Sequence, residues 1–524
     1  MAREEDLGER VTVADSVAFQ LRAAGVRHVC CMAGGYIAPF LDSARTAGLS
    51  VVPFQHEQGA AFAADAIGRM GGLGVAAATG GPGALNLLPG IASAYYDSSP
   101  TLFIVGTPPA RDLRSNGRQL GFQEAPIIWM ATPITKKVLD RGAQNVIASA
   151  CRLVRRNRPG PVLLDIPFDL QLAQLEEGHV DVEELPSSGA FELDKLFGMT
   201  FRAQRPVILA GGGIRSAGAV ELFRKFVDLQ QIPVVHSLMA VDVLPAGHRF
   251  RAGMIGAYGS FVAKKLLSRA DTVIVLGSRL DSRQQAPLQG KNVFRVDVDK
   301  KELLTSPYDT CVHADLRLWL KAAVQESVQQ VETRVPQCAP ATDAVSVFLR
   351  EVSRANRDAV AFVVDVGQNQ MQAAHGLELS PHQRFLTSGG LGAMGWALPA
   401  GIGVALETGG PVVVITGDGG MQVNIQELET LSRLGLPVRI IVLDNGELGM
   451  VRQFQDENFG GRHVATVEGY SAPDFVRVAG AYGLAHGRCF LGEDWGLRWL
   501  PMQCGPALLR VCFGATDLVW KEKR

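Results

Sequence analysis

The ten residues ITGDGGMQVN (415–424) pose the question on which the fold assignment depends. They continue the apolar run PVVVI (411–415) and place one carboxylate, Asp418, between glycines. A glycine-rich turn that leads from a strand into a helix exposes backbone N–H groups at the positive end of the helix dipole, which makes it a seat for phosphate. A carboxylate in that seat repels phosphate, so a cation is expected between the two.

Magnesium meets this requirement because it takes oxygen ligands and commonly bridges one or two protein oxygens to a phosphate. The next apolar run, VRIIVLDN (438–445), offers a second ligand in Asn445. Parallel strands joined by one helix bring their carboxyl ends side by side. We therefore expect Asp418 and Asn445 to share one ion.

A helix is expected directly after the turn. Asn424 and Glu427 stand three positions apart, like an N-cap and its partner at the third helical position. The residues that follow have apolar side chains at helical spacing, namely Ile425, Leu428, Leu431 and Leu434. Neither a Walker A motif nor GxGxxG is present, so a generic nucleotide loop is not indicated.

Short apolar runs alternate with helix-like segments along the whole chain, which predicts an α/β fold with parallel sheets flanked by helices. Two acidic or proline-rich stretches, 171–195 and 330–344, interrupt this alternation of strands and helices and are interpreted as linkers. They divide the chain into three predicted domains, at 8–175, 190–332 and 345–524. The strands are expected within 27–33, 50–55, 74–79, 101–106, 161–167, 206–213, 233–237, 271–277, 293–299, 361–367, 411–419, 438–445 and 506–513.

The outer two domains also share a local pattern. GVAAATGGPGALN (74–86) and PVVVITGDGGMQVN (411–424) both run from a strand through a glycine-rich turn to an asparagine. An internal repeat of this kind suits two related folds that face each other across a shared ligand.

Charge and cysteine content exclude several classes of partner. The 51 basic and 52 acidic residues give a net charge of −1, so no global field attracts nucleic acid or an anionic membrane. The eight cysteines form no CxxC pair, and Cys30 and Cys31 lie in an apolar run, which indicates reduced core thiols. The start MAREEDLGER has no apolar signal core, and no stretch reaches the roughly 20 apolar residues of a membrane span. A cytoplasmic enzyme is expected.

Five longer stretches of the sequence, given at the end of this paragraph, follow one another in a family order. Together with the GDG turn and Asn445, these stretches make the chain resemble the acetolactate synthase and acetohydroxyacid synthase family of thiamine diphosphate enzymes. The resemblance implies a pyrimidine-binding, a central and a diphosphate-binding domain, and a homodimer or homotetramer with active sites at the subunit interface. Whether the enzyme has a regulatory subunit stays open. The stretches are 54–72 (FQHEQGAAFAADAIGRMGG), 78–100 (ATGGPGALNLLPGIASAYYDSSP), 158–167 (RPGPVLLDIP), 387–403 (TSGGLGAMGWALPAGIG) and 415–455.

The resemblance also implies a set of binding residues. Magnesium would be held by Asp418, Asn445 and the main-chain carbonyl of Glu447. Met394 would hold the cofactor in a bent shape, and the carbonyl of Gly392 would accept from its amino group. Further cofactor contacts are implied for Val366, Gly367, Gln368, Asn369, Gly417, Gly419, Gly420, Leu448, Gly449 and Met450.

His56 and Glu57 need a separate interpretation. Residue 60 is alanine, so the zinc motif HExxH fails. A glutamate at a helix start is ordinarily a solvated residue that favours the helix dipole. The resemblance instead makes Glu57 the carboxyl that hydrogen-bonds the aminopyrimidine ring, where an apolar pocket favours its neutral form. Gln123, in GFQE (121–124), is implied as a second catalytic residue.

The resemblance implies pyruvate as donor and a second 2-keto acid as acceptor. Two departures put the acceptor in doubt, because Phe454 stands where the biosynthetic enzymes place tryptophan and Phe168 where the family often has lysine. Transfer of the acyl anion to an aldehyde, sugar ketone or amine therefore stays open, as does simple decarboxylation of the 2-keto acid. A non-catalytic, cofactor-binding regulatory protein is an alternative of a different class.

The middle domain raises the question of a second cofactor. VILAGGGIRSAG (207–218) lacks the spaced third glycine of a dinucleotide fingerprint. GMIGAYG (253–259) and GSRLDSR (277–283) stand where the family holds FAD, but Tyr258 replaces a histidine. FAD and a vestigial or ADP-like site both stay open.

Overall fold

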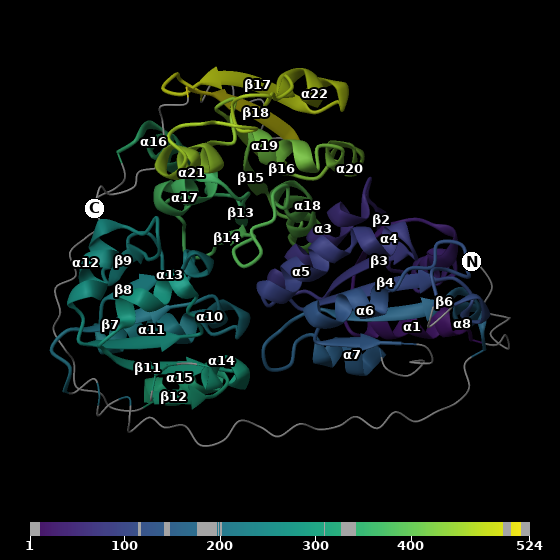
Figure 1. The fold of residues 1–524 in the computed structure, drawn as a ribbon, viewed down its shortest axis with the longest axis horizontal. Helices are drawn as coiled ribbons and strands as arrows, with labels where there is room; N and C mark the ends of the chain where they lie inside the picture. The colour runs from purple at the N-terminus through teal and green to yellow at the C-terminus, as the bar shows by residue number, and fades with distance from the viewer. Residues whose placement is uncertain are drawn as a thin grey trace.

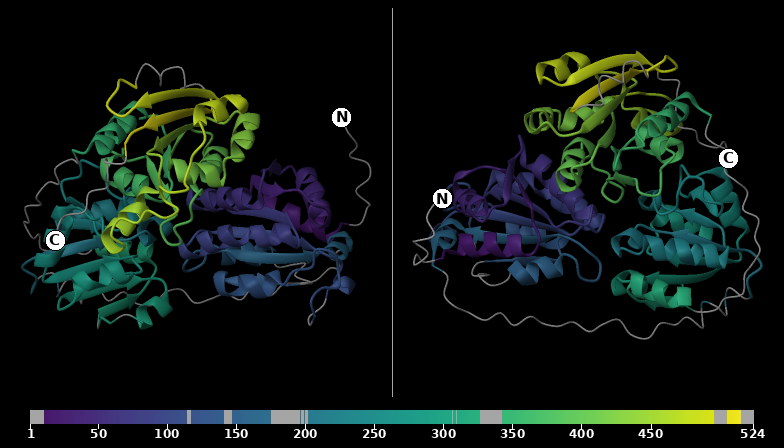
Figure 2. Two further views of the ribbon diagram at one scale, coloured as in Figure 1. Left: turned by 45° about the horizontal axis from the view of Figure 1, so that its top comes forward. Right: turned by 180° about the vertical axis from the view of Figure 1, so that it is seen from behind.

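The computed structural model describes residues 11–113, 117–140, 147–174, 202–305, 307–308, 310–325, 342–495 and 505–514, together with Leu196 and Met199. These residues form three α/β units, each built on one six-stranded parallel sheet with helices on its faces (Figure 1, Figure 2). The predicted fold class is confirmed. Most of both predicted linkers lies outside the described residues.

The N-terminal sheet has the order β2-β1-β3-β4-β6-β5. Its strands are β1 (His28–Met32), β2 (Ser50–Pro53), β3 (Gly74–Thr79), β4 (Thr101–Thr107), β5 (Lys137–Leu139) and β6 (Val162–Pro167). Its helices are α1 (Val13–Ala23), α2 (Ala38–Thr46), α3 (Glu57–Arg69), α4 (Pro82–Asn86), α5 (Leu88–Tyr96), α6 (Ile127–Ala131), α7 (Ile147–Leu153) and α8 (Phe168–Leu172).

The C-terminal sheet has the order β14-β13-β15-β16-β18-β17, which repeats the N-terminal order strand for strand. Its strands are β13 (Ala361–Val364), β14 (Arg384–Thr387), β15 (Val412–Gly417), β16 (Val438–Asp444), β17 (Ala485–Phe490) and β18 (Ala507–Cys512). Its helices are α16 (Ala344–Ala355), α17 (Gln368–Gly376), α18 (Ala397–Thr408), α19 (Asp418–Val423), α20 (Glu427–Leu434), α21 (Gly449–Asn458) and α22 (Phe475–Ala481).

The central sheet has a different order, β9-β8-β7-β10-β11-β12. This is the doubly wound order of dinucleotide-binding folds, whose ligands bind where the order reverses, here between β7 and β10. The strands are β7 (Pro206–Ala210), β8 (Val234–His236), β9 (Arg251–Met254), β10 (Thr272–Leu276), β11 (Asn292–Asp297) and β12 (Thr310–His313). The helices are α10 (Gly213–Ser216), α11 (Val220–Gln230), α12 (Phe261–Arg269), α13 (Ser282–Gln285), α14 (Lys300–Leu304) and α15 (Leu316–Gln325).

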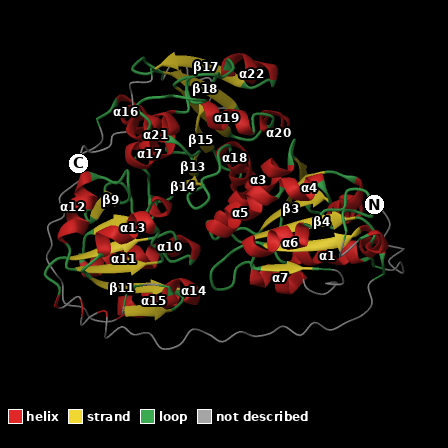
Figure 3. Ribbon diagram, in the orientation of Figure 1, coloured by secondary structure: helices red, strands yellow, loops and turns green. Residues whose placement is uncertain are grey.

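The two outer domains pack through α3 and α18, which lie side by side at the centre of the molecule (Figure 3). Both helices consist mainly of small residues, and a Cβ added at Gly403 would overlap the backbone of Ala63. Glycine therefore lets the helices approach closely, and one apolar core runs through both domains. None of the described helices is long and apolar enough to cross a membrane.

The expected helix cap at Asn424 and Glu427 is wrong. Asn424 ends α19 instead, and its side-chain amide donates to the carbonyl of Gly395 at 2.8 Å. Glu427 is the first residue of α20, and its carboxylate accepts the backbone N–H groups of Gln55 and His56 from the N-terminal domain. Distant backbone groups, a carbonyl acceptor for Asn424 and two N–H donors for Glu427, take both side chains away from the local cap.

Candidate active site and nucleotide cleft

Asp418 occupies the turn between β15 and α19, as the sequence predicts. Its side chain is buried, its carboxyl interacts with the Tyr470 hydroxyl, and its Oδ2 makes no further hydrogen bond to the described residues. Burial, together with repulsion by Asp444, raises the pKa of the Asp418 carboxyl to about 7. A buried carboxylate with a spare oxygen is stabilised by a cation, so this position fits a magnesium ligand.

The two other predicted ligands lie on the loop after the neighbouring strand, β16. Gly417 is the register partner of Leu443 in β16, so Asp418 and Asn445 follow the ends of adjacent strands. The Oδ1 of Asn445 accepts the N–H of Glu447 at 3.3 Å. The carboxylate of Glu447 forms an ion pair with Arg452 at 2.7 Å, so its side chain is engaged elsewhere.

The loop after β13 brings the predicted diphosphate residues to the same edge of the sheet. Gly367 has φ +110°, a conformation that favours glycine, and begins the turn into α17. A Cβ at Gly449 would overlap Oε1 of Gln368 and come within 2.8 Å of Nδ2 of Asn445. The loops after β13 and β16 therefore meet, with Val366 and Asn369 alongside, and the amide of Asn369 donates to the carbonyl of Asp365 at 2.7 Å.

Asp365 is a structural residue of this site that the sequence interpretation missed. Its carboxylate accepts N–H groups from Val366 at 2.8 Å and Gly395 at 3.1 Å, and the hydroxyl of Thr416 at 3.3 Å. Burial raises its pKa to about 6. Gly420 packs against it, since a Cβ there would lie 2.9 Å from Oδ2 of Asp365.

Met394 and Gly392 lie on the loop that joins β14 to α18. Gly392 has φ +72°, and a Cβ there would meet nothing within 4 Å, so this side of the loop is open. Met394 is 40% exposed. A Cβ at Gly419 would contact Leu448 at 2.5 Å and both Met394 and the Tyr470 hydroxyl at 3.4 Å, so these side chains surround the turn. Met450 lies beside them and accepts a hydrogen bond from Tyr258 at 3.1 Å.

Glu57 belongs to a second group of residues in the N-terminal domain. It is buried at the first position of α3, and its Oε2 accepts the side-chain amide of Asn86 at 3.0 Å. A Cβ at Gly83 would lie 3.0 Å from its other oxygen. Gln123 lies nearby, against Gly81, and holds a left-handed backbone with φ +59°. A non-glycine residue in that conformation is unusual and often marks a functional site.

The structure keeps these two groups apart. No interaction among the described residues joins Glu57 or Gln123 to Asp418, Asn445 or Met394, and α4 lies away from α19 in Figure 1. Exposed apolar side chains lie on the segments that carry both groups. Phe122 is 76% exposed next to Gln123, and Leu85 is exposed on α4 next to Asn86. Leu391 is exposed next to Gly392, and Val423 is exposed at the end of α19.

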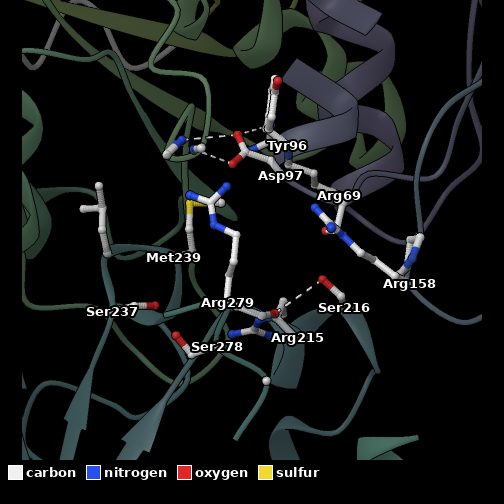
Figure 4. A pocket seen from close by; sticks show the side chains of 18 of the residues that line it. Arg69, Tyr96, Asp97, Arg158, Arg215, Ser216, Ser237, Met239, Ser278 and Arg279 are labelled. Atoms are coloured by element: carbon white, nitrogen blue, oxygen red, sulfur yellow. Dashed lines mark hydrogen bonds and ion pairs between the residues drawn. The ribbon is translucent and has the colours of Figure 1, made fainter. Parts of the chain in front are cut away.

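A cleft of about 780 Å³ lies where all three domains meet. It is at the switch point of the central sheet, between the turns that follow β7 and β10. Arg215 and Arg279 enter it from the central domain, and Arg69 and Asp97 from the N-terminal domain (Figure 4). Arg215 is paired with Asp242 at 3.1 Å. Asp297, the last residue of β11, also lines the cleft, and burial raises the pKa of its carboxyl.

Comparisons with known proteins agree with this geometry. The patterns for thiamine pyrophosphate enzymes match as an N-terminal TPP binding domain over 11–127, a central domain over 193–323 and a C-terminal TPP binding domain over 365–494. The chain is 33% identical to the acetolactate synthase isozyme 2 large subunit of Escherichia coli strain K12, over 96% of each chain. The chain belongs to the acetolactate synthase large-subunit family. It is a thiamine diphosphate enzyme, with Mg²⁺ as the usual partner of that cofactor.

Two other relatives match at similar levels. The acetolactate synthase large subunit of Lactococcus lactis subsp. lactis strain IL1403 is 32% identical, over 89% of this chain and 86% of its own. A probable acetolactate synthase large subunit of Methanocaldococcus jannaschii is 32% identical, over 92% and 88%. Nearly the whole chain therefore follows this family.

The departures from the family pattern have structural consequences. Phe454 lies on α21, is 55% exposed and packs edge-on against Phe459 at 5.8 Å between ring centroids. Phe168 begins α8 and packs edge-on against Tyr36 at 6.2 Å. Tyr258 lines the cleft and donates a hydrogen bond to Met450 on α21. Phe454 therefore differs on α21, the helix that follows the loop of Asn445 and Glu447.

Proposed function

We propose that this protein decarboxylates pyruvate or a related 2-keto acid and joins the resulting acyl unit to an acceptor, as its acetolactate synthase relatives are named for doing. The observation that carries the proposal is the buried Asp418 carboxyl, whose pKa is raised to about 7, beside Asn445 and the loop after β13. Family membership over 96% of the chain supports it.

Each group of residues has a distinct proposed role. Thiamine diphosphate supplies the carbon centre that cleaves and forms carbon–carbon bonds. Asp418, Asn445 and the Glu447 carbonyl would hold Mg²⁺. Val366, Gly367, Gln368 and Asn369, with Gly417, Gly419, Gly420, Leu448, Gly449 and Met450, would bind the cofactor.

The second group would act at the other end of the cofactor. Glu57 would protonate the aminopyrimidine ring and so activate the neighbouring amino group as a base. The Gly392 carbonyl would orient that amino group, and Met394 would hold the bend. Gln123 would act on the substrate, beside the exposed Phe122.

We also propose a homo-oligomer in which each active site takes residues from two copies of the chain. The separation of Glu57 from Asp418 within one chain, and the exposed apolar side chains around both, support this arrangement. A small 2-keto acid is the proposed substrate, and neither nucleic acid nor a membrane is a proposed partner. Because the relatives are named large subunits, a companion regulatory subunit is a further candidate.

For the cleft between the domains we propose an adenine nucleotide, with FAD as the first candidate and ADP as the alternative. The dinucleotide strand order, the switch-point position and the two cleft arginines, Arg215 and Arg279, support this. A visible absorption spectrum of the purified protein decides between them, because flavin bands are expected with FAD and none with ADP or an empty site.

Two further proposals concern the chain as a whole. The domain limits are proposed as 8–175, 190–332 and 345–524, with the limits near 175, 190, 332 and 345 close to or inside stretches that the structure does not describe. A cytoplasmic location is proposed from the charge balance and from the buried thiols of Cys30, Cys31 and Cys151.

The experiment that tests the function is product identification. The protein is incubated with thiamine diphosphate, Mg²⁺, pyruvate and a panel of acceptors, and products are identified by mass spectrometry. Acetolactate from pyruvate alone supports the proposal. Acetaldehyde indicates a simple decarboxylase, and a product formed only with an aldehyde, sugar ketone or amine indicates a specialised transferase. Absence of CO₂ release across a panel of 2-keto acids would indicate a non-catalytic protein.

A further inference from the structure

Two buried carboxylates connect the N-terminal and C-terminal domains in a reciprocal way. Asp97 follows α5, the helix between β3 and β4, and Glu427 begins α20, the helix between β15 and β16. These helices occupy the same place in the two repeated sheets. Each carboxylate reaches into the other domain.

Asp97 contacts the loop that carries Gly392 and Met394. Its Oδ1 accepts the N–H of Gly390 at 2.6 Å, and its Oδ2 accepts the N–H of Gly389 at 3.2 Å. Arg69 donates to the same carboxylate at 2.9 Å and to the carbonyl of Thr387 at 2.7 Å. The N-terminal domain thus holds the first part of the loop, and Figure 4 shows Asp97 and Arg69 at this junction.

The packing at this contact is close. The side chains of Asp97 and Arg69 are 1% and 8% exposed. A Cβ at Gly390 would lie 2.7 Å from Oδ1 of Asp97 and 3.0 Å from the carbonyl of Tyr96. The loop therefore rests directly on the end of α5, and its start has little freedom to shift.

Glu427 makes the equivalent contact in the opposite direction. Its Oε1 accepts the N–H of His56 at 3.1 Å, and its Oε2 accepts the N–H of Gln55 at 3.3 Å. Thr430 donates to Oε2 at 2.7 Å. Glu427 is fully buried, and a Cβ at Gly59 would overlap Oε1. His56 is the N-cap of α3, so Glu427 fixes the backbone at the point where α3 begins with Glu57.

We propose that Asp97 and Glu427 are reciprocal positioning residues. Each fixes the backbone position of the loop that follows the second strand of the other domain. Glu427 would fix Glu57, and Asp97 would fix Gly392 and Met394. A carboxylate suits this task because it accepts two neighbouring N–H groups, whereas an amide of the same shape turns a donor toward one of them. The inference rests on the proposed function for the roles of Glu57 and Met394.

The test compares Asp97→Asn with Glu427→Gln, using hydrogen exchange measured by mass spectrometry on the full chain. Glu427→Gln is expected to speed exchange in the segment 54–60, and Asp97→Asn in the segment 387–395, each about tenfold and each leaving the other segment unchanged. The control is Asp271→Asn, because Asp271 also accepts two successive N–H groups, from Gln204 and Arg205, but lies in the central domain. It should change neither segment.

Binding and turnover give a second, separable readout. Asp97→Asn is expected to raise the dissociation constant of thiamine diphosphate about tenfold. Glu427→Gln is expected to lower kcat about tenfold while that dissociation constant changes less than about twofold. Gly390→Ala crowds the contact of Asp97, and Gly59→Ala crowds the contact of Glu427, while both carboxylates are kept. Each alanine variant should therefore reproduce the defect of the matching carboxylate variant, including where the carboxylate variant folds poorly.

The inference is overturned if either carboxylate variant loosens both segments equally, or if Asp271→Asn produces the same changes. It is also overturned if dissociation constant and kcat change together in both variants. A wild-type protein that forms no product would refute the proposed function instead, and the exchange pattern would still decide the positioning roles.

Discussion

The N-terminal and C-terminal domains have the same strand order but place their functional residues at different points of it. After the third strand, the C-terminal domain has the turn Gly417–Asp418, whereas the N-terminal domain has Gly80–Gly81. After the second strand, the N-terminal domain has Glu57 and the C-terminal domain has Gly392 and Met394. One fold therefore provides two half-sites whose chemistry depends on a few loop residues.

The difference shows how a repeat becomes one active site. In the proposed function, a carboxylate after the third strand makes a half-site for metal and diphosphate, and a carboxylate after the second makes a half-site for a ring that must gain a proton. Each half-site lacks the functional residues of the other. A substitution in one half-site should therefore leave the function of the other half-site unchanged. The following predictions test that independence.

The largest effect is expected in the N-terminal half. Glu57→Gln should lower kcat by about 10²–10⁴-fold, because an amide cannot transfer the proton. The affinity for thiamine diphosphate should change little, since the diphosphate half is untouched. Steady-state kinetics and calorimetry measure the two quantities, and a variant with full activity would refute the role of Glu57.

In the C-terminal half, Asp418→Ala should weaken the binding of Mg²⁺ and thiamine diphosphate together. Loss of one partner of a buried charged contact costs about 3–5 kcal/mol, which corresponds to an affinity loss of roughly 10²–10³-fold or more. Calorimetry with each ligand checks this. Unchanged affinity for both would contradict the metal assignment.

The contribution of Glu427 to the stability of the fold should depend on pH. Burial raises the pKa of Glu427 to about 7, although its hydrogen bonds from Thr430, Gln55 and His56 act in the opposite direction. A carboxyl whose pKa is higher in the folded state stabilises the fold at low pH and loses that contribution as the pH rises through about 7. The stability of the wild type relative to Glu427→Gln should therefore fall by about 3 kcal/mol between acidic pH and pH 8.

Thermal or denaturant unfolding at a series of pH values measures this difference. A relative stability that rises with pH would show that the carboxylate is charged in the folded state and that its hydrogen bonds outweigh burial. The two N–H contacts of Glu427 are those of the ionised carboxylate, which predominates above about pH 7.

The smallest effect concerns acceptor choice. Phe454→Trp restores the residue typical of biosynthetic relatives and should change the preference among acceptors by about 1–3 kcal/mol, or roughly 10–200-fold, with little change in cofactor affinity. Phe459→Trp, on the neighbouring ring, is the control. Equal product ratios in the wild type and Phe454→Trp would remove Phe454 from the acceptor site.

Much of the architecture could be predicted from sequence, because buried parallel strands are continuous apolar runs. All thirteen expected strands are present. The five that were missed, β5, β9, β12, β14 and β17, all lie at sheet edges. Edge strands are short or partly exposed and so lack a clear apolar run; β17, for example, is AHGRCF.

The placement of Asp418 and Asn445 after adjacent strands could be predicted, because both residues follow apolar runs and stand in a motif. Asp97, Asp365 and Glu427 gave no such signal. Their partners are backbone N–H groups, which any residue can supply, and for Asp97 and Glu427 those partners lie in another domain. Glu427 was even assigned to a local cap that the structure does not form, because a three-residue spacing carries no information about distant donors.

The central claim is that Glu57 of one chain and Asp418 of another serve the same active site. The most direct test mixes inactive Glu57→Gln chains with inactive Asp418→Ala chains under conditions that allow subunit exchange. Each hybrid dimer then has one intact site, so a one-to-one mixture should regain about a quarter of wild-type activity. Activity no greater than the sum of the two separate variants would contradict the claim and place each site within a single chain.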